Sequence, residues 1–182
     1  MAEMKIFSTG IDPSDWIPRR FTQLGDGRTP PIFWQHLPPD TKSLVLLMEH
    51  REAEAGRKVR WLLYDMPPAA EGIHEGGPLP EGTKLGRNDF GTIAYRPPEA
   101  NANHQLQHYD FILMATDLPT LGLAEGANWE SVKGRLRTGD HRDELAPPPA
   151  GDPRGREFHP LGHIIDHAEF SGHFALDTDK RV

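Results

Sequence analysis

Three continuous apolar runs along the chain give the first structural prediction. They cover residues 43–48, 60–66 and 109–115, and turn-forming or charged residues follow each of them. Runs of this length between Pro and Gly residues are more typical of strands buried in a sheet than of helices. Residues 31–34 predict a further strand, because a short apolar stretch there is followed by a Pro-Pro-Asp turn.

Helical patterns are confined to the last third of the chain. Residues 127–136 predict a helix with Asn128 as its N-cap, since apolar residues recur there at helical spacing. Residues 161–169 show similar spacing and predict a second helix, and residues 170–176 predict a final strand. Between the two helices, residues 138–160 are charged and rich in proline, so they predict an extended insertion without a core of its own.

Length and composition agree with this pattern of short segments. A chain of 182 residues suits one domain, so residues 1–182 are predicted to fold as a single unit around the insertion. The 18 glycines and 18 prolines are distributed over many short segments, which favours a β-rich domain with long connections.

Charge and residue usage exclude several classes of function. The net charge of −7 argues against a nucleic-acid partner, because phosphate backbones require a basic surface. The absence of cysteine removes disulfides, thiol nucleophiles and cysteine-bound metals. No apolar stretch is long enough for a membrane span, and the first residues do not resemble a signal peptide, so we expect a cytoplasmic protein.

Common catalytic and cofactor motifs are also missing from the sequence. There is no Gly-x-Ser-x-Gly elbow and no glycine-rich phosphate loop, so hydrolases and nucleotide-dependent enzymes are disfavoured. His163 and His167 are four residues apart on the predicted helix and could chelate a metal, but no third ligand is evident. Packing or capping is the better interpretation of this pair, and we predict neither a metal nor a cofactor.

The segment 84–98 is the most distinctive in the chain. Its Asn88-Asp-Phe-Gly91 core is followed by Tyr95 and by the pair Pro97-Pro98, which predicts a rigid loop beside a strand edge. This loop resembles a loop of the phosphatidylethanolamine-binding protein family, and four other segments resemble motifs that occur in the same order in that family. They are Arg28-Thr-Pro30, Pro38-Pro-Asp-Thr-Lys-Ser, His108-Tyr-Asp-Phe111 and Gly162-His-Ile-Ile-Asp-His-Ala-Glu-Phe-Ser-Gly172.

The resemblance implies a mainly β fold, with β-sandwich-like sheets, peripheral helices and a small anion-accepting pocket near one end. In the family, an Asp-Pro-Asp-x-Pro motif, a Trp-x-His motif and a His two residues before a Tyr form this pocket. Here the first motif is replaced by Glu49-His-Arg-Glu-Ala53 and the second by Lys58-Val-Arg60. The last His becomes Gln107, whereas Tyr109 is retained. An arginine stays charged where a histidine would exchange protons near neutral pH.

The resemblance therefore implies a modified pocket with five candidate ligand-binding residues, and the predicted ligand is a small polar or anionic molecule. A second interpretation is an ion pair between Glu49 and Arg60 that closes an inactive pocket. A third is a repurposed enzyme, such as a cyclase or isomerase in small-molecule biosynthesis, in which Glu49 acts as acid or base while Arg60 and Tyr109 stabilise developing charge. The five residues are Glu49, Arg60, Asp89, Gln107 and Tyr109.

Protein partners give a fourth interpretation. The resemblance allows a protein-interaction regulator of the kinase- or protease-inhibitor type, with the 138–160 insertion as its contact surface. Bacterial members of the family tend to form dimers, so it also allows a homodimer.

Overall fold

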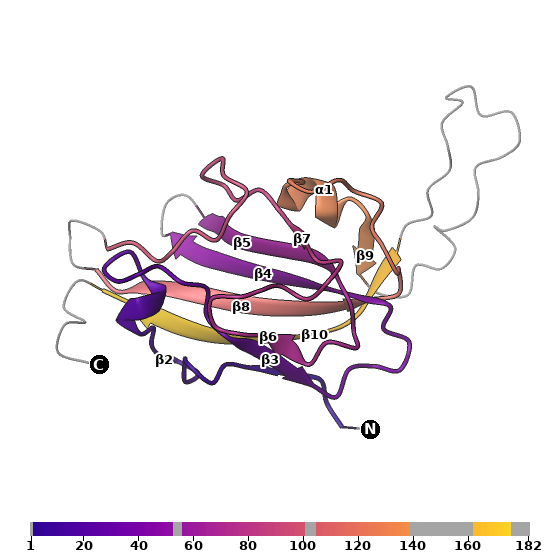
Figure 1. Cartoon of the computed structure of the whole chain (residues 1–182), viewed down its shortest axis with the longest axis horizontal. Coiled ribbons are helices and arrows are strands. Elements are labelled where there is room, and N and C mark those ends of the chain that lie inside the picture. The colour runs from indigo at the N-terminus through magenta and orange to yellow at the C-terminus, as the bar shows by residue number, and fades with distance from the viewer. Residues whose placement is uncertain (1, 53–55, 101–104, 139–161, 176–182) are drawn as a thin grey trace, which may run out of the picture.

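The computed structural model describes residues 2–52, 56–100, 105–138 and 162–175. It consists mainly of two β-sheets whose strands pair mostly in antiparallel fashion, and one short α-helix lies at the periphery (Figure 1). The mainly β, sandwich-like fold expected from the sequence is confirmed. The elements are β1 (Lys5–Phe7), β2 (Asp15–Trp16), η1 (Arg19–Phe21), β3 (Ile32–Gln35), β4 (Ser43–Glu52), β5 (Gly56–Met66), β6 (Gly72–Ile73), β7 (Lys84–Leu85), β8 (Gln107–Thr116), α1 (Trp129–Lys133), β9 (Leu136–Thr138) and β10 (Gly162–Phe174).

The larger sheet has the order β2-β10-β8-β4-β5-β7, with β9 paired to β10. Its central strands β8, β4 and β5 contain the three continuous apolar runs, so the prediction of buried strands at these positions is confirmed. Both faces of these strands are covered, which explains why their sequences are continuously apolar and do not alternate with polar residues.

Each face of the larger sheet has its own core. The smaller sheet β1-β3-β6 covers one face, which we call the inner face, and includes the predicted strand at 31–34. Helix α1 and its neighbouring loops cover the other face, here the outer face, where Val132 packs with Val45, Leu62 and Tyr64. In Figure 1, α1 and β3 accordingly lie on opposite sides of the long strands.

One of the two predicted helices is correct in position, and the other is wrong. Helix α1 begins after Asn128, whose side chain accepts a hydrogen bond from the backbone N–H of Ser131 as an N-cap should. Residues 162–174, in contrast, form the long strand β10, which pairs with β8 along most of its length. The segment predicted as an insertion lies almost entirely outside the described residues.

A β-bulge explains the wrong helix prediction. Ile164 pairs with Thr116 and Asp166 pairs with Ala115, so Ile165 is an extra residue in β10. As a result Ile165 and Ala168 pack against the same core although they are three residues apart. The bulge therefore gives a strand the apolar spacing of a helix.

Within the described ranges, no helix is long and apolar enough to cross a membrane.

Candidate functional site

Strand alternation separates the side chains at the end of β4 and β8 into two groups. The side chains of Leu46, Met48 and Phe111 belong to the inner core. The residues that alternate with them along each strand face the outer side. Glu49 and Asp110, which are register partners, consequently lie on the outer face, whereas His50 and Tyr109 face inward.

A second bulge brings Arg60 to the inner face. Met48 pairs with Trp61 and Glu49 pairs with Val59, which leaves Arg60 without a register partner on β4. Trp61 belongs to the inner core and Val59 to the outer core, so the bulge lets two consecutive residues, Arg60 and Trp61, share the inner face. The freed backbone carbonyl of Arg60 accepts a hydrogen bond of 2.8 Å from the backbone N–H of Arg96.

Four polar residues meet on the inner face near the ends of β4, β5 and β8. We call them the inner cluster: His50, Arg60, Gln107 and Tyr109. The ring of His50 stacks on that of Tyr109 with a centroid distance of 4.8 Å, and the guanidinium carbon of Arg60 lies 5.5 Å from the Tyr109 ring centre. Arg60 is only 3% exposed and Tyr109 is fully buried.

Hydrogen bonds of Gln107 determine which nitrogen of His50 donates. The Nε2 amide of Gln107 donates to the backbone carbonyl of Gln105 over 3.2 Å, so its Oε1 is directed to His50. His50 Nε2 lies 2.5 Å from that oxygen and must be the donor, because an amide oxygen only accepts. In neutral His50 the other nitrogen, Nδ1, is then an acceptor.

The loop that follows Asn88 closes over Arg60. Arg60 Nη1 donates to the backbone carbonyl of Pro97 over 2.8 Å and lies 3.5 Å from the carboxylate of Glu99. Glu99 also forms an ion pair with Arg96, so two guanidinium groups share this carboxylate. The ring of Phe90, which is 38% exposed, lies 4.8 Å from the guanidinium carbon of each arginine.

Burial sets the protonation of two members of the inner cluster. It raises the pKa of Tyr109 to about 12, with the nearby Arg60 opposing the shift. Burial also lowers the pKa of His50, and the Gln107 hydrogen bond opposes that effect. At neutral pH the cluster therefore presents a phenol, a neutral imidazole and the permanent positive charge of Arg60.

Two buried polar atoms of the inner cluster, Nδ1 of His50 and Nε of Arg60, have no hydrogen-bond partner among the described residues. The hydroxyl oxygen of Tyr109 has no side-chain partner there, but the backbone N–H of Glu99 lies near enough to oppose the rise of its pKa. His50 Nδ1 does lie 3.5 Å from the carboxylate of Glu52. Buried polar groups are normally satisfied, so open atoms on the neighbouring side chains of His50 and Arg60 fit a place where a ligand could bind.

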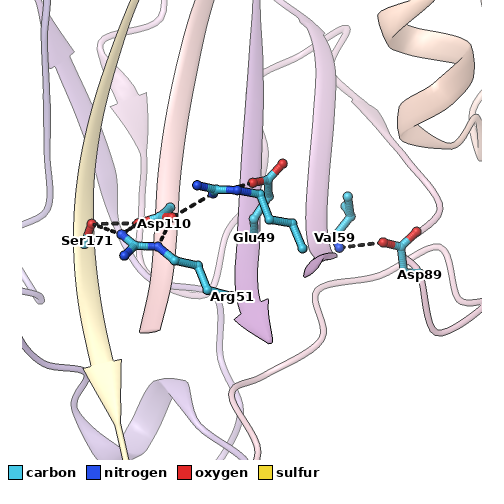
Figure 2. A network of polar contacts seen from close by, with 7 residues as sticks. Glu49, Arg51, Val59, Asp89, Asp110 and Ser171 are labelled. Carbon is cyan, nitrogen blue, oxygen red and sulfur yellow. Dashed lines mark hydrogen bonds and ion pairs between the residues drawn. The ribbon is translucent and has the colours of Figure 1, made fainter. Parts of the chain in front are cut away.

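The outer face has a separate polar network around Asp110 (Figure 2). Arg51 donates to both carboxylate oxygens of Asp110, at 2.7 and 2.5 Å, and the hydroxyl of Ser171 donates to Oδ1 over 2.7 Å. Arg57 Nη1 donates to Glu49 at 2.8 Å and to Asp110 at 2.9 Å. These bonds, led by that from Arg51, lower the pKa of Asp110 to about 2.

A cavity of about 350 Å³ lies on the same outer face, next to this network. Glu49, Asp89, Trp129 and Glu130 line it, together with Arg57 and Lys133. Asp89 is fixed there by the end of β5, because its carboxylate accepts from the backbone N–H of Val59 at 2.7 Å and its own N–H donates to the Val59 carbonyl at 2.9 Å.

The structure divides the five residues selected from the sequence. Arg60, Gln107 and Tyr109 come together on the inner face, and Glu49 and Asp89 lie on the outer face. The Glu49–Arg60 ion pair considered as an alternative is not formed, since Glu49 pairs with Arg57 and Arg60 with Glu99.

Sequence reasoning missed His50 and Glu99 as members of this region. Their signal was weak: His50 lies two residues after the inner residue Met48 in a strand. Glu99 follows the Pro-Pro pair, and nothing in its sequence context marks it.

The His163 and His167 pair stands on β10 and not on a helix. His163 is buried, and its Nδ1 lies 3.0 Å from the carboxylate of Asp117, which also accepts from the His163 backbone N–H. His167 is exposed. In the part of the chain that the structure describes, no group of three or more His, Asp or Glu residues is arranged to hold a metal ion.

Comparison with known proteins identifies related chains. The model of the family described as phosphatidylethanolamine-binding protein matches residues 7–139. A UPF0098 protein of Aquifex aeolicus is 35% identical over 138 residues, which cover 74% of this chain and 81% of that protein. A UPF0098 protein of Methanothermobacter thermautotrophicus is also 35% identical, over 64% of this chain and 78% of its own.

Two solved structures share the fold. The crystal structure of a putative phosphatidylethanolamine-binding protein homolog from Chlamydia trachomatis has a TM-score of 0.75 and 26% identity, covering 96% of this chain and 99% of that one. Escherichia coli YbcL has the same TM-score at 17% identity, with coverage of 97% and 100%, and shows the fold alone.

Proposed function

Because the chain belongs to the phosphatidylethanolamine-binding protein family, we propose that it binds a small anionic or polar molecule at the inner cluster. The observation that supports this proposal most strongly is the pair of buried atoms left without a partner on His50 and Arg60, Nδ1 and Nε. A ligand that carries both an acceptor and a donor would satisfy them, because Arg60 Nε donates and Nδ1 of neutral His50 accepts.

The charge of the inner cluster supports an anionic group on the ligand. Arg60 is almost fully buried and shares the carboxylate of Glu99 with Arg96. A buried guanidinium with an incomplete set of partners gains from an oxyanion that can accept its remaining N–H group. The lipid in the family name is not carried over, because Arg60 and Gln107 stand where the family motifs have histidines.

An enzyme that uses Glu49 with Arg60 and Tyr109 has no geometric support. Such a mechanism requires the acid–base group within hydrogen-bond reach of the reacting atoms. The sheet separates Glu49 from the inner cluster, so we do not propose a cyclase or isomerase of this kind.

The regulator interpretation, the homodimer and the cytoplasmic location stay predictions. The regulator interpretation depends on the 138–160 insertion, nearly all of which lies outside the described residues. Deleting it should abolish retention of a protein partner in a pull-down while the chain still folds; unchanged retention would contradict this role.

Substitution of Arg60 tests the proposed site. We expect inorganic phosphate or acetate to raise the Tm of the unmodified chain relative to sodium chloride at equal ionic strength, because a ligand that binds only the folded state stabilises it. Arg60→Gln should weaken phosphate binding by at least about tenfold, since it removes a charge-assisted contact. Differential scanning fluorimetry and isothermal titration calorimetry measure the two effects.

Arg51→Gln is a matched control for this experiment. Arg51 lies on β4, but its guanidinium binds Asp110 on the outer face. Its replacement should lower the Tm without removing the phosphate-dependent rise. Phosphate binding that is equal in the unmodified chain and Arg60→Gln would contradict the proposed site, as would an unmodified chain that responds to neither anion.

A further inference from the structure

The outer cavity brings together chemistry that the proposed function does not use. It is formed where helix α1 and the Asn88 loop lie over the ends of β4 and β5, on the side of the sheet opposite the inner cluster. Its volume of about 350 Å³ is within the range of small-molecule sites. Glu49 and Asp89, which the family resemblance placed in a single pocket with Arg60, are both in its wall.

Glu49 is a buried carboxylate whose negative charge is balanced by few hydrogen-bond donors. The residue is 8% exposed, and its one described hydrogen-bond partner is Nη1 of Arg57 at 2.8 Å. That same nitrogen also donates to Asp110 at 2.9 Å. A desolvated carboxylate that shares its donor with a second carboxylate remains favourable for a further cation.

Asp89 presents a second carboxylate in a fixed position. Its two hydrogen bonds with the backbone of Val59 hold it at the end of β5 and use one of its carboxylate oxygens. Figure 2 shows Glu49 and Asp89 on either side of Val59. A ligand between them would meet acceptors from two elements that are both anchored to the sheet.

The remaining lining residues favour a positively charged ligand with an apolar part. Glu130 adds a third carboxylate, while Lys133 and the already engaged Arg57 are the cations of the lining, so its formal charge is negative. Trp129, which is half-buried, adds an aromatic side chain to the wall. An indole face attracts cations and also packs against short alkyl chains.

From this arrangement we propose a second binding site, in the outer cavity, for a small organic cation that carries a primary ammonium group on a short apolar chain. The ammonium group lies among the carboxylates of Glu49, Asp89 and Glu130, and the alkyl part packs on Trp129. The site is independent of the inner cluster, because the two are on opposite faces of the sheet and share no residue.

Titration with n-butylammonium chloride, followed by the indole N–H resonance of Trp129, tests the proposal. The chain has four tryptophans, and the loss of one indole signal in Trp129→Phe identifies the relevant one. We expect a saturable shift of this resonance, and we expect Glu49→Gln and Asp89→Asn each to weaken binding by about tenfold, the effect of losing one charge-assisted hydrogen bond. Asp89→Asn keeps an oxygen for the Val59 N–H and so preserves the loop.

Several controls keep the result decisive. Sodium butyrate has a similar alkyl chain and the opposite charge, and should give no saturable shift. Glu130→Gln tests the cavity even if Glu49→Gln fails to fold, since the Glu130 side chain makes no hydrogen bond or ion pair with another described side chain. Glu81→Gln, at an exposed site elsewhere, should bind as the unmodified chain does.

The proposal is overturned if butylammonium produces no saturable shift, if butyrate binds equally well, or if Asp89→Asn and Glu130→Gln both retain full affinity. Each of these outcomes is separate from failure of the inner site, which is tested with phosphate and Arg60→Gln.

Discussion

Replacement of Asp110 with asparagine is expected to lower the free energy of unfolding by about 3 kcal/mol at pH 7. Asp110 is 3% exposed and accepts charge-assisted hydrogen bonds from Arg51 and Arg57, besides one from Ser171. The neutral amide cannot accept at both positions, and its N–H group would face the donors. Urea denaturation at pH 7 measures the loss.

The pH dependence separates the ionic part of this effect from simple packing. The pKa of Asp110 in the folded chain is about 2, below its ordinary value near 4, because Arg51 holds the carboxylate ionised. A group whose pKa is lowered on folding stabilises the protein above its unfolded-state pKa, and this contribution disappears as the pH falls towards the folded-state pKa. Stability should therefore decline between about pH 5 and 2.

The difference between the unmodified chain and Asp110→Asn should consequently shrink on acidification. After a reduction for the half-exposed arginines, we expect it to fall by about 1 kcal/mol between pH 7 and pH 3. Ser171→Ala, which removes a neutral donor, should cost about 1 kcal/mol at both pH values. A difference for Asp110→Asn that does not change with pH would contradict an ionic role.

Replacement of Asn88 with alanine should have a comparably large effect. The Asn88 side chain is buried and forms four hydrogen bonds within its loop: Nδ2 donates to Thr92 Oγ1 and the Ala94 carbonyl, and Oδ1 accepts from the N–H groups of Phe90 and Thr92. Removing them leaves part-buried backbone groups of the loop without these partners, so we expect a loss of about 3 kcal/mol in the free energy of unfolding.

Asn88→Ala should also affect the inner cluster, because the same loop carries Phe90 and Pro97 against Arg60. The phosphate-dependent rise in Tm should decrease. Thr92→Val is the matched control: it removes the one hydrogen bond from Asn88 Nδ2 to the Thr92 hydroxyl and should cost no more than about 1 kcal/mol. A similar loss in the two variants would show that Asn88 does not organise the loop.

The sequence predicted the parts of the fold that depend on local chemistry. Continuous apolar runs located β4, β5 and β8, and the Asn88-Asp-Phe-Gly91 motif located a rigid loop. Gly91 has a φ of 82°, a conformation that favours glycine, as the motif indicated. The N-cap residue Asn128 also located α1 from the sequence, because its capping hydrogen bond is local and joins residues three positions apart.

The distribution of side chains between the two faces could not be predicted in the same way. The family resemblance grouped Glu49 with Arg60. A strand that is apolar on both sides does not reveal which of two consecutive residues faces which core, so the residues themselves did not separate the two. The bulges at Arg60 and Ile165 depend on partners distant in sequence, and each changes the alternation of its strand. The bulge at Arg60 places this residue on the inner face beside Trp61. The bulge at Ile165 gives a strand the apolar spacing that is typical of a helix.

The bulge at Arg60 also separates the chemistry of this position from the strand pairing of the sheet. Its side chain has no register partner on β4, and its backbone is held by Arg96 of the neighbouring loop, so a different residue can be accommodated without altering the pairing of the sheet. A change of side chain at this one position would alter the chemistry of the inner cluster while the hydrogen-bonded framework of the sheet stays in place. For protein engineers, Arg60 is accordingly the first position at which to vary the chemistry of the inner cluster.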